Sequence, residues 1–127
     1  MPEKNLFEYA VIRVVPRVER EEFLNVGIIL YCAKQKFLKA NVYINEHKIL
    51  TFIPELEIDF LKENLYAIPK ICEGGVDAGP IGLLDNASRF RWLTATRSTV
   101  IQSSKVHPGL CGDAEETLQK LTEQLVF

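Results

Sequence analysis

Two polar segments of the chain carry side chains suited to binding an anion. Residues 17–27 contain two arginines among three glutamates, and residues 89–109 contain four basic residues and no acid. In the second segment an arginine lies between hydroxyl side chains, and both groups donate the hydrogen bonds that phosphate and carboxylate oxygens accept. The residues that we predict to bind an anion are Arg17, Arg20, Thr96, Arg97 and Ser98.

Both segments also have structural interpretations. The charges of residues 17–27 would fix a loop through internal ion pairs, and the hydroxyls around Arg97 would serve a turn between two strands. If the segments converge, carboxylates or a bound anion must lie between their arginines. We expect Arg17, Arg97 and Ser98 to line one concave site that residues 73–88 partly close. This glycine-rich loop lacks the motifs of phosphate-binding loops, so a plain connection is its alternative interpretation.

A catalytic interpretation uses some of the same residues. His107 is the most suitable general base, because histidine side chains titrate near neutral pH, although the Pro-Gly pair after it is typical of a turn. An enzyme would combine this base with Glu19 or Glu22 as carboxylates and with Arg97 as the group that stabilises charge. The sequence shows no recognisable nucleophile and no paired acid and base, so we prefer a binding function to a catalytic one.

The cysteines do not form a recognisable metal site or disulfide framework. Cys32, Cys72 and Cys111 are odd in number and widely spaced, which predicts reduced thiols. A structural metal site needs about four ligands, and His107 with Cys111 offers two. We therefore expect no metal and no cofactor.

Composition excludes several classes of protein. With 47% hydrophobic and 25% charged residues, the 127-residue chain suits one folded domain, and no apolar run is long enough to span a membrane. The first residues lack the features of a secretory signal, so we expect a cytoplasmic protein. A pI near 5.7 and the lack of a recognition helix argue against sequence-specific DNA binding.

Apolar and β-branched residues predict three strands in the first third of the chain. Residues 6–15 and 26–33 are almost continuously apolar, which is typical of strands covered on both faces. Residues 37–44 alternate between apolar and polar side chains. A short polar turn joins the second and third strands, and this connection predicts an antiparallel hairpin. We expect residues 6–15 to form the centre of the sheet.

Helical spacing of apolar residues predicts a short helix over residues 45–53 and two main helices over residues 55–68 and 113–126, with Asn45 and Asp113 as N-caps. The prediction is therefore a single α+β domain spanning residues 1–127. Its sheet is antiparallel or mixed, with about five strands, and the two main helices pack on it. The predicted core includes Val11, Ile28, Leu30, Phe60, Leu65, Trp92 and Leu121.

The segment from Arg89 begins with alternating charged and aromatic residues. If this segment is a strand, Phe90 and Trp92 face the core while Arg89 and Arg91 face water. The residues that follow, around Arg97, would then form a turn that leads to another strand.

Three stretches of the chain resemble a bacterial family classified as a domain of unknown function. They are residues 8–13, residues 17–27, and residues 89–102 together with 106–110, and the resemblance covers nearly the whole chain. It implies a partner, because genes of this family often lie beside a gene for a kinase-like protein that resembles the HipA toxin. It implies no catalytic residues.

Two functions from different classes are therefore predicted. The first is a non-catalytic partner or regulator whose basic surface binds an anion: a phosphate group, a nucleotide or a protein partner such as the HipA-like kinase. The alternative is a small hydrolase or transferase that acts on a phosphorylated or nucleic-acid substrate.

Overall fold

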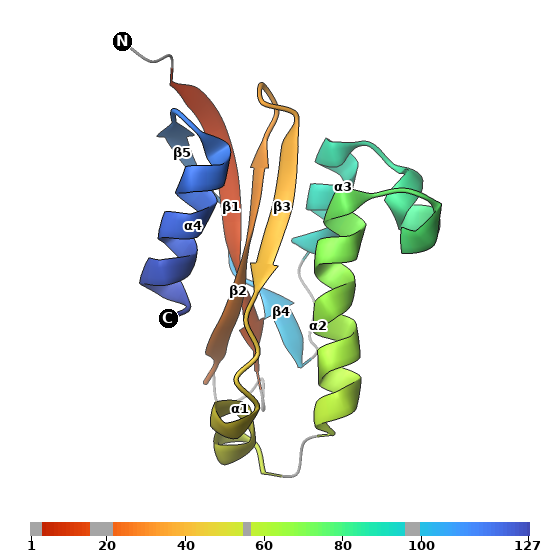
Figure 1. Ribbon diagram of the computed structural model, residues 1–127, viewed down its shortest axis with the longest axis vertical. Coiled ribbons are helices and arrows are strands. Elements are labelled where there is room, and N and C mark those ends of the chain that lie inside the picture. Colours follow the sequence, from red (N-terminus) through yellow and green to blue (C-terminus); the bar gives the residue numbers. More distant parts are fainter. Residues whose placement is uncertain (1–3, 16–21, 55–56, 96–99) are drawn as a thin grey trace.

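The chain is built around a five-stranded antiparallel sheet, which confirms the predicted α+β class and the predicted number of strands (Figure 1). The computed structural model describes residues 4–15, 22–54, 57–95 and 100–127. The strands are β1 (Asn5–Val14), β2 (Leu24–Cys32), β3 (Phe37–Val42), β4 (Ile101–Ser103) and β5 (His107–Cys111). Their order is β3-β2-β1-β4, and β5 also pairs with β1. The first strand is therefore central, as predicted.

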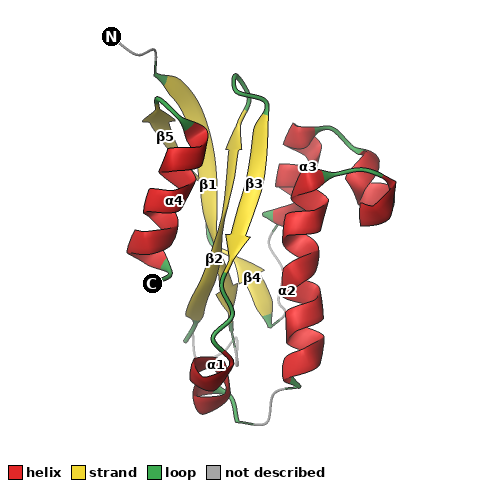
Figure 2. Ribbon diagram, viewed as in Figure 1, coloured by secondary structure: helices red, strands yellow, loops and turns green. Residues whose placement is uncertain are grey.

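Four α-helices occur in the described residues, whereas the sequence predicted two main helices and a short one (Figure 2). They are α1 (Glu46–Phe52), α2 (Ile58–Glu73), α3 (Asn86–Leu93) and α4 (Ala114–Leu125). The predicted N-caps are confirmed: Asn45 accepts a hydrogen bond from the backbone N–H of Lys48, and Asp113 from that of Glu115. Helix α2 continues past its predicted end, through Pro69, and ends at Glu73, with Gly74 as its C-cap.

The first three strands form the predicted antiparallel pairs. In the β2–β3 pair, Gly27 lies opposite Val42, and a Cβ on this glycine would lie 2.6 Å from the carbonyl oxygen of Asn41. The backbone of β3 thus comes close to Gly27, and this close approach explains why a residue without a side chain lies in this strand.

Strands β4 and β5 share one side of β1. Strand β4 pairs with residues 12–14 and β5 with residues 5–9. Between them, the N–H of Ser104 donates to the carbonyl oxygen of Val11, and the Ser104 hydroxyl accepts from the Val11 N–H, both at 2.8 Å. A side chain therefore completes the hydrogen bonding of β1 where strand pairing is interrupted. Residues 107–109 lie in β5 because they pair with β1, so the turn predicted there is wrong.

The sheet separates two hydrophobic clusters. Ala10, Ile12 and Val14 of β1 face α2 and α3, whereas Phe7 and Val11 face α4. Figure 1 shows α4 and α2 on opposite sides of the sheet. The predicted core residues that are buried are Val11, Ile28, Leu30 and Leu65. Strand β1 is therefore covered on both faces, as its nearly continuous apolar sequence predicted.

Three predicted core residues are not buried. Phe60 is 67% exposed and Trp92 is 41% exposed, while Leu121 is half-buried. The buried stripe of α2 runs through Leu61 and Leu65, and a shift of one residue turns a side chain by about 100° around a helix. Phe60 therefore points away from the core, and Leu121 lies at the border of the stripe that buries Leu118 and Thr122 in α4.

Residues 86–93 form helix α3, so the strand predicted for the start of the basic segment is wrong. Asp85 is the N-cap, and its carboxylate accepts a hydrogen bond from the backbone N–H of Ser88 at 2.7 Å. Helical spacing then buries Phe90 and Leu93 and leaves Trp92 on the border of the buried face. The helix formed because the cap and the tertiary packing outweigh a short alternating pattern.

Arg89 is buried, although the strand prediction placed it in water. Its Nη1 donates to the carbonyl oxygens of Ile71 and Cys72 at 2.7 and 2.6 Å, and its Nε donates to that of Leu84 at 2.9 Å. Its Nη2 donates to the Asn86 side chain. The first two carbonyls belong to the last turn of α2, where the helix dipole favours a cation. Arg89 thus ties the end of α2 to the start of α3.

The predicted loop over residues 73–88 is shorter than expected. It contains two 3₁₀ turns, η2 (Val76–Ala78) and η3 (Pro80–Leu83), and its last residues belong to α3. The backbone N–H of Gly75 also donates to the carbonyl oxygen of Gly82 at 2.8 Å. These bonds, with those of Arg89, give the connection a defined structure.

Candidate functional site

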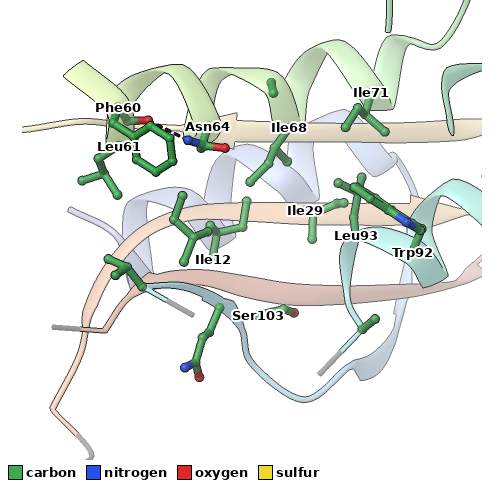
Figure 3. Close-up of a pocket in the computed structure, with 15 residues that line it drawn as sticks. Ile12, Ile29, Phe60, Leu61, Asn64, Ile68, Ile71, Trp92, Leu93 and Ser103 are labelled. Carbon is green, nitrogen blue, oxygen red and sulfur yellow. Dashed lines mark hydrogen bonds between the residues drawn. The ribbon is translucent and has the colours of Figure 1, made fainter. Parts of the chain in front are cut away.

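A cavity of about 430 Å³ opens between α2, α3 and the β4 side of the sheet (Figure 3). Its volume lies within the range of small-molecule sites. Helix α2 contributes one wall, and the sheet and the end of α3 contribute the others. The lining residues include Ile12, Ile29, Leu61, Ile68, Ile71 and Leu93.

Helical periodicity explains the α2 wall. Leu61, Asn64, Ile68 and Ile71 follow one another at intervals of three or four residues, so they share a face of the helix. Figure 3 shows this row along α2, with Ile12 and Ile29 on the sheet opposite. The helix and the sheet diverge enough here that part of the apolar stripe faces a cavity.

The described lining is mostly apolar and carries no charge. None of the described residues that line the cavity is an Asp, Glu, Lys, Arg or His. Two of its polar side chains have partners nearby: Asn64 Nδ2 donates to the carbonyl oxygen of Phe60 at 2.8 Å, and the Ser103 hydroxyl donates to that of Ser104 at 2.9 Å. Apolar burial is therefore the main force that this cavity offers to a ligand.

Large apolar side chains at the cavity are exposed to solvent. Phe60 and Trp92 line it with the exposures given above, and Val100 is 38% exposed. In Figure 3, Phe60 and Trp92 lie at opposite ends of the row of lining residues. Exposed aromatic residues grouped around a concave apolar surface are typical of a binding site. Neither Phe60 nor Trp92 was predicted to have this role, because both were assigned to the core.

The predicted anion-binding residues lie outside the described residues. This applies to Arg17, Arg20, Thr96, Arg97 and Ser98. The predicted convergence of Arg17 with Arg97 and Ser98 therefore stays a prediction. Along the chain, residues 96–99 join Ala95 to Val100, and both of these neighbours line the cavity.

His107, the predicted general base, lies on β5 away from the cavity. Its ring is tilted against that of Tyr9, with centroids 5.3 Å apart, and the residue is exposed. His107 pairs with Tyr9 on one side of β1, whereas Leu24, two residues after Glu22, pairs with Val14 on the other. Five residues of strand span about 17 Å. Glu22 is thus too far from His107 to act with it as an acid–base pair, and Glu19 lies outside the described residues.

Arg91 forms the clearest ion pair of the basic segment. Its Nη1 and Nη2 donate to the two carboxylate oxygens of Glu8 at 2.6 and 2.9 Å. The hydrogen bond to Glu8 raises the pKa of Arg91, and the coulombic attraction of the carboxylate acts in the same direction. This pair joins α3 to β1, so Arg91 has a structural partner on the surface.

The three cysteines are buried free thiols, as predicted. Burial raises the pKa of the Cys72 thiol to about 12, and the nearby Arg89 cation partly offsets this effect. Within the described ranges, no three His, Cys, Asp or Glu side chains are grouped so that they could hold a metal ion. No helix in the described part of the chain is long and apolar enough to cross a membrane.

Comparison with known proteins identifies a family. The family described as Protein of unknown function (DUF3037) matches residues 9–126, from the central strand to the end of α4. No curated protein and no solved structure matches the chain. Because the match spans almost the entire sequence, the chain belongs to the DUF3037 family.

Proposed function

We propose that this protein is a non-catalytic binding module that holds an apolar group in the cavity between α2, α3 and β4, and that it acts as a partner or regulator of another protein. The observation that carries the proposal is the uncharged, apolar character of the described residues that line a cavity of about 430 Å³. General acid–base or nucleophilic catalysis needs titratable groups beside the bound substrate, and the described lining residues supply none.

The anion-binding prediction is a second part of the proposal. We propose that Arg97 and Ser98, together with Arg17 and Arg20, bind an anionic group of the same ligand or partner. Its support is the acid-free basic sequence of residues 89–109 and the position of residues 96–99 between two lining residues. The family resemblance supplies a candidate partner, a HipA-like kinase protein.

The catalytic alternative, a hydrolase or transferase acting on a phosphorylated or nucleic-acid substrate, has less support. Its general base, His107, does not line the cavity. Glu22 lies near the Val14 end of β1, far from His107, which pairs with Tyr9. We therefore retain the binding function as the conclusion.

Tryptophan fluorescence gives a direct test. Trp92 is the only tryptophan in the chain, and it lines the cavity. We expect straight-chain alcohols from hexanol to dodecanol to shift its emission, with affinity rising about fourfold for each added methylene until the cavity is full. Fatty acids of matched length separate the two parts of the proposal, because they add only a carboxylate. They should bind more tightly than the alcohols. Arg97→Gln should abolish this difference in affinity and leave the affinity for the alcohols unchanged.

A matched pair of variants locates the site. Ala67 lines the cavity, whereas Ala33 is exposed in the β2–β3 turn. Ala67→Met should weaken binding of the alcohols by filling the cavity, and Ala33→Met should leave it unchanged. In titration calorimetry with a HipA-like kinase protein, Ala67→Met should likewise bind more weakly than the parent protein, and Ala33→Met should bind as well as the parent. The proposal is wrong if no alcohol changes the emission of Trp92, or if Ala67→Met binds as well as the parent protein.

A further inference from the structure

The face of the sheet opposite the cavity is covered along part of its width. Helix α4 packs on β2 and β3. Tyr9 and Arg13 on β1 are only half-buried on this face, and His107 on β5 is exposed. Side chains at positions 9 and 13 lie on the same face because strand residues alternate. This surface therefore carries the exposed His107 ring beside the partly exposed side chains of Tyr9 and Arg13.

Arg13 differs from the other described arginines. Arg89 makes four hydrogen bonds and Arg91 forms a bidentate ion pair, whereas Arg13 stacks its guanidinium 4.0 Å above the ring of Phe23. No carboxylate in the described ranges forms an ion pair with Arg13. Its Nε is buried and has no acceptor. A partly buried cation with an unsatisfied donor is costly unless an anion binds to it.

Asn25 has a buried acceptor without a hydrogen-bond donor. It pairs with Arg13 across the β1–β2 ladder, and its Nδ2 donates to the carbonyl oxygen of Leu125 at 3.0 Å. Its Oδ1 is buried and accepts no hydrogen bond. The position therefore offers a buried donor and a buried acceptor side by side. Both atoms have almost no accessible surface. An anionic group that carries a neighbouring hydroxyl would satisfy both once the two side chains turn towards it.

Tyr9 and His107 form the second half of the surface. Their rings contact each other with centroids 5.3 Å apart, and the Tyr9 ring also stacks on Phe7 with centroids 6.0 Å apart. Packing against Phe7 restricts the tyrosine ring, so the pair is an ordered platform. Tyr9 and Arg13 are four residues apart, or about 13 Å along the strand. A ligand that touches both must be longer than a single phosphate.

We propose that this surface binds a nucleotide, with the base stacked on Tyr9 and His107, the phosphates bound by Arg13, and a sugar hydroxyl donating to Asn25 Oδ1. Base stacking on aromatic side chains and phosphate binding by arginine are the usual means of nucleotide recognition on a sheet surface. The site is on the opposite face of the sheet from the apolar cavity and does not depend on the cavity's function.

Calorimetric titration with adenosine diphosphate, adenosine, pyrophosphate and a single-stranded pentanucleotide tests the proposal. Adenosine diphosphate should bind at least about tenfold more tightly than adenosine or pyrophosphate, because only it contacts both Arg13 and the rings of Tyr9 and His107. The pentanucleotide distinguishes a free nucleotide from a nucleic-acid strand as the source of the same groups. Tighter binding of either one supports the site. Binding of neither, or equal binding of pyrophosphate and adenosine diphosphate, would overturn the proposal.

Variants test which residue binds the phosphates and which binds the base. Arg13→Gln should weaken binding of adenosine diphosphate and of pyrophosphate by at least about tenfold, whereas Tyr9→Ala should weaken only the former. Lys34→Gln, in the exposed β2–β3 turn, removes a cation elsewhere and should change neither. Because Arg13→Gln can disturb the sheet, the Arg13 Nε–H resonance of the parent protein gives a second readout. It should shift on addition of pyrophosphate, and an unchanged resonance at saturation would also exclude the site.

Discussion

Gly74 lies directly against the guanidinium of Arg89. A Cβ at position 74 would lie 2.7 Å from Nη1 of Arg89, and the glycine has a φ of 80°, which other residues rarely adopt. The end of α2 therefore needs both the buried arginine and a glycine beside it. Their relationship explains how the chain turns from α2 towards α3.

Arg89→Met should lower the free energy of unfolding by about 2–4 kcal/mol, because it leaves three backbone carbonyls and the Asn86 side chain without their donor. Urea unfolding measures the loss. Arg91→Met is the control, since it breaks a solvent-exposed pair with Glu8 and should cost less than about 1 kcal/mol. Equal losses for the two variants would contradict the role assigned to Arg89.

Gly27→Ala should destabilise the sheet by about 1–3 kcal/mol, because its Cβ would be forced against the Asn41 backbone. Gly112→Ala is a matched control, because a Cβ there would meet nothing within 4 Å. Thermal unfolding of the two variants gives the comparison. If both melt at the same temperature, the close contact between β2 and β3 is not a constraint on residue 27.

Leu118→Ala should cost about 2–5 kcal/mol, since this leucine is fully buried between α4 and the sheet. Leu121→Ala should cost less, because Leu121 is half-buried. Chemical denaturation of both variants ranks them. A larger loss for Leu121→Ala would mean that α4 is rotated from the orientation described above.

Stability should fall at alkaline pH because of Cys72. The ordinary pKa of a cysteine thiol is 9.0, and burial raises the pKa of Cys72 to about 12 in the folded protein. Between these values the unfolded chain releases the proton and the folded chain keeps it, so the free energy of unfolding falls as pH rises, by at most about 4 kcal/mol over the window. Below pH 9 both states are protonated and the thiol has no effect.

Denaturation curves recorded from pH 8 upwards check this prediction. Cys72→Ala should be less stable at pH 8, because it leaves a small cavity, but it should lose less stability on the way to high pH. Other alkaline groups titrate equally in both proteins. Parallel pH dependences would show that burial of Cys72 does not carry the effect.

The strands were predictable because their signal is local. Residues 6–15 are apolar on both faces, and this pattern alone implied a strand covered by helices on both sides, which the two clusters confirm. Asn45 and Asp113 likewise marked the starts of α1 and α4 through a cap that lies next to the helix it begins.

Helix α3 and the cavity were not predictable from local patterns. The alternation of Arg89 to Trp92 is compatible with a strand, and Asp85 with Ser88 was the signal that indicated a helix. The cavity depends on how far α2 diverges from the sheet, which is a tertiary property. For the same reason, Phe60 and Trp92 were assigned to the core: an apolar residue in a helix or a strand faces either the core or a binding surface.

Arg13 was visible in the sequence as a lone cation in an apolar strand, yet its meaning depended on its neighbours. Only the structure shows that Phe23 stacks on it and that Asn25 lies opposite with an unsatisfied oxygen. The sequence drew attention to Arg17 and Arg20, a few residues further along, because they lie in a visibly polar run.

The pairing of β1 with Ser104 also determines when the fold can be completed. Val11 and Ser104 are 93 residues apart in the chain. During synthesis β1 can pair early with β2, but its other edge stays open until residues 101–111 emerge. Long-range pairing of this kind slows folding, and an open apolar edge promotes aggregation. Chains that terminate before residue 101 should therefore accumulate as insoluble material, since their central strand lacks its last neighbours.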